Sequence, residues 1–319
     1  MLTNIRFTAT QARVGVLAAM VIFFSIRSPV FFTSRNLTNV LINASVVGIL
    51  AIGLTLLLVA QQVDVSVGSA LAFSGAVFAV IATDGGSLFL AVLGALAAAL
   101  AVSALNVVAI VRLRVNSVIV TLAGFVGLRG VAKLVLNGRS VQFEGFEWLG
   151  RGRVPIGSFI DVPVPVIALF IVFAFYFFLM KYTRFGKHIY AIGANPEASR
   201  LAGIRLEREV SIAFFLLGLL VALAALISVS QIGATSPTTG MGIEFLALTG
   251  VVLGGGSLRG GSGTAVGTVV AVVILAVLDN GLVLLGVSSF WVEVARGALL
   301  LGAVIFDELG RERGIRMGL

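Results

Sequence analysis

The residues of this chain that could do chemistry are carboxylates that stand in or beside long apolar stretches. An ionisable group at membrane depth is costly, so each is a candidate for binding a proton or a solute. These carboxylates are Asp64, Glu244, Asp279 and Glu293. Glu293 lies three residues before Arg296. We therefore expect these two side chains to form an ion pair on one helical face.

Asp64 lies between two apolar runs, just before Val65 and Ser66. We expect its carboxylate to cap the helix that starts there. Capping at the break of a span is compatible with lining a transport pathway. Neutral amides near the spans can bind a solute or join two helices. The candidate pathway or broken-helix residues are Asp64, Ser66, Asn43, Asn106 and Asn280.

The sequence lacks the residue sets of the common enzyme classes. It has no Cys and one His, His188, which lies beside Lys187 and reads as a solvated side chain. A thiolate or multi-His metal centre within one chain is therefore excluded. The glycines of 254–263 lack the Lys and Ser or Thr of a phosphate-binding loop and suit tight turns or close helix packing. We expect no catalytic residue, no metal site and no bound cofactor.

The composition predicts a membrane protein. Of the 319 residues, 59% are hydrophobic and 11% are charged, whereas a soluble domain is typically about 45–50% apolar and about 25% charged. The mean hydropathy is +1.13. We expect an all-α, polytopic membrane helix bundle of about ten transmembrane helices, forming one domain over residues 1–319. The expected spans are 12–28, 40–60, 66–83, 87–111, 117–137, 163–181, 210–230, 244–257, 264–286 and 290–307. The run 66–83 is short enough to belong to a broken or re-entrant element.

Basic residues set the expected orientation, because cytoplasmic loops are enriched in Lys and Arg. They gather near the N-terminus (Arg6, Arg13), in the loop 181–209 and near the C-terminus (Arg311, Arg313, Arg316). An even number of expected spans separates these regions, so all three, with both termini, are expected in the cytoplasm. Five arginines fall on the outer side against this rule: Arg27, Arg35, Arg139, Arg151 and Arg153. The net charge of +8 is therefore explained by basic residues in the loops and at the chain ends. The sequence has no basic stripe with interleaved aromatics, the pattern that would indicate nucleic-acid binding.

Two polar segments stand apart from the spans. In the loop 181–209, Asn195 can cap a short helix that starts at Pro196 and ends at Gly203. A helix of about two turns is unstable alone in water, so it needs a surface to pack on, either its own loops or a partner. The outer segment 138–162 is rich in glycine. It serves either as a connector or as a docking surface, and the sequence leaves both open.

Several motifs resemble one family over nearly the whole chain. Residues 190–204, YAIGANPEASRLAGI, resemble the coupling-helix segment of permeases from sugar ABC importers, and 63–69, VDVSVGS, resemble the family's IDLSVGS signature. Residues 254–263, followed by NGL at 280–282 and LGVSS at 285–289, resemble its C-terminal half. By this resemblance the chain is similar to a permease subunit of a ribose-type (carbohydrate) ABC importer. Ala194 and Gln62 stand where the family often has Gly.

The resemblance implies a multi-pass subunit of the bacterial inner membrane, surrounded by lipid, that moves a monosaccharide. It implies a second permease copy or a paralogue, a tandem-cassette ATPase that binds ATP and Mg below, and a periplasmic sugar-binding protein above. The segment 194–204 would then sit in a cleft of the ATPase. The coupling residues that the resemblance implies are Asn195, Pro196, Glu197, Ala198, Arg200, Leu201, Ala202 and Gly203.

Other functions remain open from the residues alone. An ion-coupled secondary transporter could use one of the carboxylates as a proton carrier. A permease for autoinducer-2 or for branched-chain amino acids is closely related. The run Ala-Asn-Pro-Glu-Ala at 194–198 favours a sugar over a branched-chain amino acid.

Overall fold

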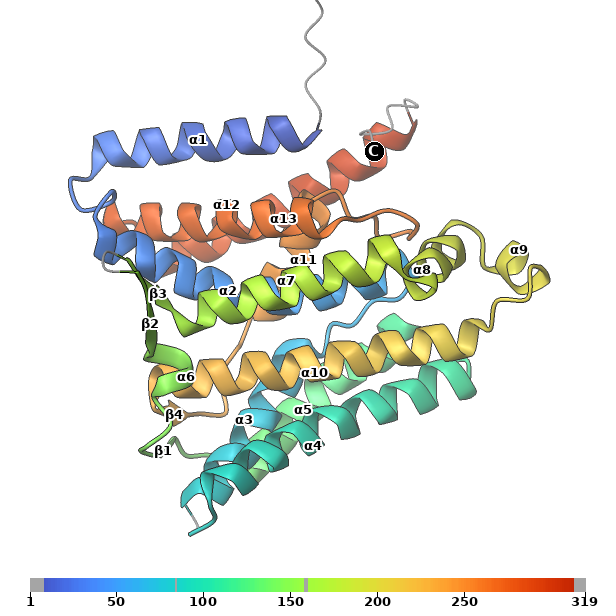
Figure 1. The fold of residues 1–319 in the computed structure, drawn as a ribbon, viewed down its shortest axis with the longest axis horizontal. Helices are drawn as coiled ribbons and strands as arrows, with labels where there is room; N and C mark the ends of the chain where they lie inside the picture. The colour runs from blue at the N-terminus through green and yellow to red at the C-terminus, as the bar shows by residue number, and fades with distance from the viewer. Residues whose placement is uncertain (1–8, 84, 158–159, 313–319) are drawn as a thin grey trace, which may run out of the picture.

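The computed structural model describes residues 9–83, 85–157 and 160–312 (Figure 1). Arg6, Arg313 and Arg316, used above for orientation, lie outside the described residues. The N-terminal half contains α1 (Ala9–Arg27), α2 (Ser34–Val59), α3 (Val67–Thr83), α4 (Leu88–Val107) with a π-helical turn at Val108–Arg112, and α5 (Ser117–Val135). The outer segment holds α6 (Trp148–Arg151), and α7 (Val164–Tyr182), α8 (Arg184–Ala194) and α9 (Pro196–Leu201) follow it. The last helices are α10 (Leu206–Ile232), α11 (Ile243–Leu253), α12 (Ala265–Leu284) and α13 (Ser289–Glu312).

The described chain is a helical, multi-pass membrane protein. Seven of its described helices are long and apolar enough to cross a bilayer, and α3 and α11 are shorter apolar helices. The expected span 244–257 is too long, because α11 ends at Leu253 and a glycine-rich turn follows. Outside the helices there are two small antiparallel pairs, which the sequence did not predict. β1 (Val141–Gln142) pairs with β4 (Ala234–Thr235), and β2 (Arg153–Ile156) pairs with β3 (Ile160–Pro163).

Two long antiparallel helices, α2 and α10, form the centre of the bundle (Figure 1). Leu50, Leu54 and Leu57 of α2 and Phe214 of α10 are almost completely buried. The helices that follow them repeat one pattern, since α2 packs on α11 and α12 while α10 packs on α3 and α4. In the same way α3 packs on α5 and α11 packs on α13. The bundle therefore contains two similar halves, α2–α5 and α10–α13, with their central helices running in opposite directions.

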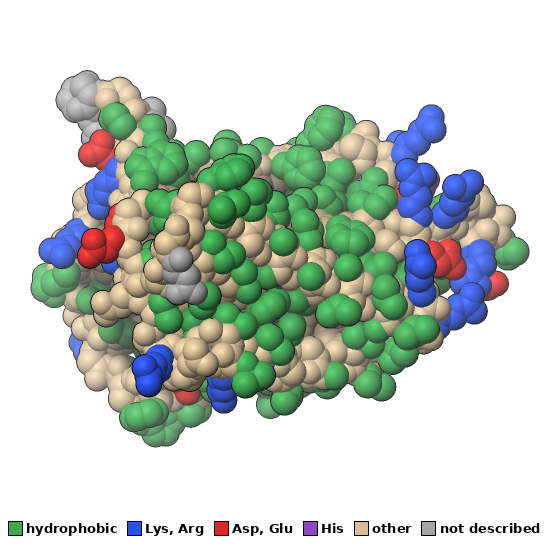
Figure 2. Space-filling model, turned by 90° about the horizontal axis from the view of Figure 1, so that it is seen from below, with side chains coloured by type: hydrophobic (Ala, Val, Ile, Leu, Met, Phe, Trp, Pro, Cys, Tyr) green, Lys and Arg blue, Asp and Glu red, His purple; other side chains and the backbone are tan. Residues whose placement is uncertain are grey.

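The surface has the polarity of a membrane protein. Figure 2 shows a broad apolar band across the middle of the molecule, with Lys and Arg gathered mainly at the two ends. Large apolar side chains such as Ile26, Val126 and Phe170 are 78%, 71% and 68% exposed, which suits contact with lipid. Exposed basic residues of α8, α9 and the start of α10 mark one end: Arg184, Lys187, Arg200, Arg205 and Arg208. The first turn of α1 and the end of α13 lie toward this same end (Figure 1).

The glycine-rich turn 254–263 holds α8 against the end of α2. The Gly261 N–H donates to the Val59 carbonyl (2.9 Å), and the Gln61 side chain donates to the Gly193 carbonyl (2.9 Å). Burial raises the pKa of the Tyr190 phenol, so its hydroxyl stays protonated and donates to the Gly263 carbonyl (2.7 Å). These glycines form tight turns at a close approach of backbones, as the sequence predicted, and no phosphate loop.

Gly193→Ala should loosen this joint. A Cβ at Gly193 would lie 1.8 Å from the Val59 carbonyl oxygen and 2.5 Å from the Gly261 nitrogen, so backbone must move. We expect a loss of about 1–3 kcal/mol in the free energy of unfolding, measured by thermal unfolding in detergent. Gly15→Ala in α1 is the control, because its Cβ would meet no atom within 4 Å. Equal stability of the two variants would refute the tight joint.

Candidate functional site

Asp64 organises the break between α2 and α3. Its Oδ1 accepts hydrogen bonds from the Ser66 backbone N–H (2.7 Å) and hydroxyl (2.6 Å), which is the capping geometry that the sequence predicted. Its Oδ2 accepts from Nδ2 of Asn106 on α4 (3.1 Å). Three of the candidate pathway residues therefore meet at one buried point, although Asn106 is 42 residues away in the chain.

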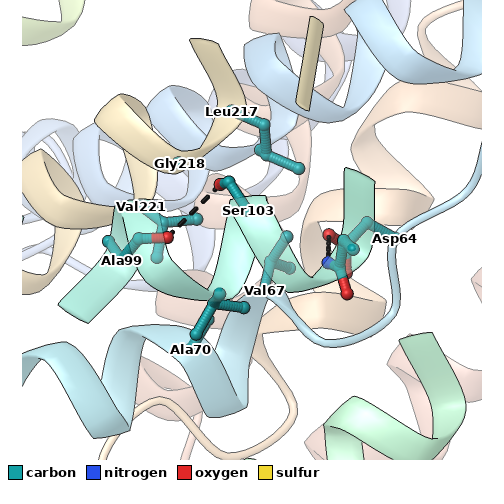
Figure 3. Close-up of a pocket in the computed structure, with 10 residues that line it drawn as sticks. Asp64, Val67, Ala70, Ala99, Ser103, Leu217, Gly218 and Val221 are labelled. Carbon is teal, nitrogen blue, oxygen red and sulfur yellow. Dashed lines mark hydrogen bonds between the residues drawn. The ribbon is translucent and has the colours of Figure 1, made fainter. Parts of the chain in front are cut away.

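A very small cavity adjoins this carboxylate. Figure 3 shows Asp64 and Val67 at the start of α3, Ser103 of α4 and Gly218 of α10 around it. Its volume is about 10 Å3, the space of about one water. The Ser103 hydroxyl donates to the Ala99 carbonyl (3.3 Å). The space is too small for a sugar, so Asp64 acts here as a structural group at the centre of the bundle.

A second buried carboxyl group, Glu244, lies where the first turns of α3 and α11 meet. Its Oε1 accepts from the Gly242 N–H (3.1 Å), and its Oε2 has no hydrogen-bond partner among the described residues. Glu244 is 2% exposed. Its Oε2 lies 1.9 Å from the position that a Cβ on Gly68 would take, so only glycine fits there. A carboxylate beside the N-terminus of α3 is favoured by the helix dipole.

Arg129 of α5 donates to the carbonyls of Pro237 (3.2 Å) and Thr239 (2.7 Å). Arg129 was missed, although a lone arginine inside the apolar run 117–137 was a visible signal.

The short helix α9 forms as the sequence predicts. The Asn195 side chain accepts from the Ala198 backbone N–H (3.0 Å), and Pro196 is the first helical residue. Gly203 ends the helix with a φ of +83°, a conformation that favours glycine. Glu197 and Arg200 form a surface ion pair at 3.8 Å. All the residues named for coupling therefore lie on α9 or at its ends.

The apolar face of α9 is unpartnered. Ala198 and Ala202 are exposed, and Leu201 is 84% exposed. The helix projects from the end of the bundle (Figure 1), and Ser199 is its buried residue. The sequence left open whether this helix packs on the chain's own loops or on a partner. In the structure the chain's own loops cover only a small part of the helix.

Two sequence-based interpretations of charged residues are wrong. Arg296 pairs with Asp279 of α12 through two nitrogens, at 3.0 Å and 2.7 Å, and not with Glu293, which is exposed. The reason is that α12 and α13 pack side by side, and a bidentate pair across them is geometrically better than a pair along one helix. His188 is also not simply solvated, because its Nδ1 lies 3.0 Å from Glu209 Oε1 on α10.

The two remaining pathway candidates lie apart from Asp64. Asn280 of α12 exchanges two hydrogen bonds of 2.9 Å with Asn36 of α2, so it joins two helices. Asn43 of α2 lines a separate cavity at the other end of the bundle. Within the described residues, no group of His, Asp and Glu has the arrangement of a metal site.

The fold and these features define a class, the multi-pass helical membrane proteins. A family described as branched-chain amino acid transport system / permease component matches residues 36–304. The ribose import permease protein RbsC of Escherichia coli (strain K12) is 41% identical over 303 residues, covering 93% of each chain. The L-arabinose ABC transporter permease protein AraH of Azospirillum brasilense is 34% identical over 304 residues, covering 94% of this chain and 89% of the relative.

A further relative is the xylose transport system permease protein XylH of Escherichia coli (strain K12), at 32% identity over 94% of this chain and 91% of the relative. No solved structure matches. The chain belongs to the branched-chain amino acid transport system / permease component family. The relatives also confirm the resemblance to ribose-type ABC permeases, and with it a multi-pass protein of the inner membrane.

Asp64→Leu should destabilise the bundle more than Asn106→Leu. The first change leaves the Ser66 N–H, the Ser66 hydroxyl and the Asn106 amide without their acceptor, whereas the second removes a single donor. We expect losses of at least about 2 kcal/mol and about 1 kcal/mol in the free energy of unfolding. Denaturant titration of the purified chain measures both. If Asn106→Leu cost as much as Asp64→Leu, the assignment of Asp64 as the organising group would fail.

Proposed function

We propose that this chain is the transmembrane permease subunit of an ABC importer that moves a monosaccharide, ribose or a related sugar, across the inner membrane. A separate ATPase drives it. The observation that carries the proposal is the capped helix α9, whose apolar face is exposed, in a chain whose relatives are sugar permeases. ATP and Mg are bound by the partner, and this chain itself holds no cofactor and catalyses no reaction.

The proposed topology has ten crossings with both termini in the cytoplasm. It counts α1–α5, α7 and α10–α13, including the short α3 and α11. The basic end of the bundle with α8 and α9 then faces the cytoplasm, in agreement with the enrichment of Lys and Arg there. Lys133 and the five outer arginines lie at the opposite end or near it. Arg151 among them donates to the carbonyls of Gln231 (2.7 Å) and Ile232 (3.0 Å), so it has a structural role.

The proposed partners follow from the two ends. The ATPase cleft would receive residues 195–203, whose apolar side chains are exposed, and α8 would carry its movement to the end of α2. The outer segment with α6 would face the periplasmic sugar-binding protein. A second permease copy or a paralogue would complete the pathway within the lipid bilayer.

The alternatives are an ion-coupled secondary transporter and an ABC permease for autoinducer-2 or branched-chain amino acids. Two of the four candidate carboxylates are engaged in structural contacts, which speaks against them as free proton carriers: Asp64 caps α3 and Asp279 holds Arg296. The relatives compared above are named for ribose, arabinose and xylose.

Removing the ATPase gene should abolish uptake of radiolabelled sugar even when the proton gradient is intact, because in the proposed importer ATP hydrolysis by that subunit drives transport. Uptake is measured in cells that express the permease and the binding protein with or without the ATPase. A protonophore in the complete system is the matching control, and it should reduce uptake only through lower ATP. Uptake that survives without the ATPase would instead support a secondary transporter.

Ala198→Glu should uncouple transport from ATP hydrolysis. The substitution places a charge on the exposed apolar face of α9, where a partner would bury it. We expect uptake in proteoliposomes of the assembled importer to fall at least about tenfold, while the subunit still inserts. Thr10→Glu, at an exposed position in the first turn of α1, carries the same charge as a control and should transport normally. Unchanged transport by Ala198→Glu would refute the coupling role.

A further inference from the structure

A polar cavity lies at the end of the bundle away from α9. Its volume is about 290 Å3, and its walls come from α2, the last turns of α10, the start of α11 and α13. This is near the lower limit of cavities that hold small ligands, about 300 Å3. It is distinct from the water-sized space beside Asp64.

Three neutral polar side chains line this cavity: Asn43, Ser228 and Gln231. Amide and hydroxyl groups both donate and accept hydrogen bonds, as the hydroxyls of a sugar require. Nε2 of Gln231 is buried and has no hydrogen-bond partner among the described residues. A buried donor without an acceptor is costly, so a rotation of the Gln231 amide toward the cavity, where a solute oxygen could accept from Nε2, would be favourable.

The cavity is electrically balanced. Arg296 is the charged residue among the described residues that line it, and its guanidinium is bidentate on Asp279 (3.0 Å and 2.7 Å). A zwitterionic amino acid would need two free opposite charges, and the cavity offers none. Val46, Ile243 and Leu246 supply apolar surface for the C–H face of a sugar ring. The lining therefore suits a neutral polyhydroxylated solute.

The outer segment is fixed to the same wall. Arg151, at the end of α6, donates to the Gln231 carbonyl (2.7 Å), and the Gly150 N–H donates to the Ser230 hydroxyl (2.7 Å). A protein that docks on the outer segment would therefore press directly on the turn of α10 that carries Gln231. The cavity therefore lies next to the outer segment and is connected to it through α10, on the side from which the sugar would arrive in the proposed importer.

We infer that this cavity is a transit site for a monosaccharide, in which the Gln231 and Asn43 amides hydrogen-bond the sugar after the binding protein releases it. The inference rests on the proposed function. It adds a place within one permease chain where the sugar pauses. Because hydrogen bonds to three neutral groups are weak in water, the site binds loosely and lets the sugar leave.

Single-cysteine labelling tests occupancy directly, because the natural chain has no Cys. Gln231→Cys in the assembled importer is treated with a small methanethiosulfonate reagent in the presence of D-ribose, L-arabinose or D-xylose, and labelling of the permease band is measured. We expect at least one sugar to slow labelling about threefold or more at high concentration. Thr10→Cys, at an exposed position of α1 outside the cavity, should be labelled at the same rate with and without sugar. Equal rates at position 231 with all three sugars, or protection by L-leucine instead, would overturn the inference.

A transport measurement separates the inference from the proposed function. Gln231→Leu should lower Vmax/KM for sugar uptake about three- to tenfold, the loss expected for one hydrogen bond, with Thr10→Leu in the first turn of α1 as the unaffected control. The amount of assembled complex and its ATPase rate are measured for each variant, so a folding defect is recognised. If the unmodified importer takes up none of the three sugars, the proposed function fails. If it does take one up and Gln231→Leu transports equally well, the transit site fails.

Discussion

A buried carboxyl group is stabilised by hydrogen bonds, and those that Asp64 accepts fix the geometry of the break between α2 and α3. The group caps α3 through Ser66 and reaches α4 through Asn106. These bonds allow the chain to leave helix after Val59 and start again at Val67 inside an otherwise apolar core. Glu244 accepts from the Gly242 N–H at the first turn of α11, and its other oxygen lies close to Gly68. Both short helices thus begin beside a buried carboxylate.

The sequence predicts the helices well because their signals are local. The run 117–137 corresponds to α5 at Ser117–Val135, and Asn195 caps α9 as the order Asn-Pro-Glu predicts. Hydrophobic length and capping chemistry depend only on neighbouring residues. For the same reason the broken span after Asp64 is predictable from the residues on either side of it.

What depends on packing between distant segments could not be predicted. Arg296 selects Asp279 over Glu293 because α12 lies beside α13, a fact that no spacing along one helix contains. The contact of Asp64 with Asn106, and the pairing of Asn280 with Asn36, likewise depend on which helices become neighbours. The small strands β1 and β4 are two residues each, too short for an alternating pattern to be read.

The attachment of α8 has a consequence for how the two halves of the bundle move. Gly193 touches both the end of α2, which belongs to the first half, and Gly261 in the turn between α11 and α12, which belongs to the second. A force on α9 would therefore reach the contact between the two halves, and not one half alone. If α9 transmits the movement of an ATPase as proposed, this single contact would move both repeats at the same time.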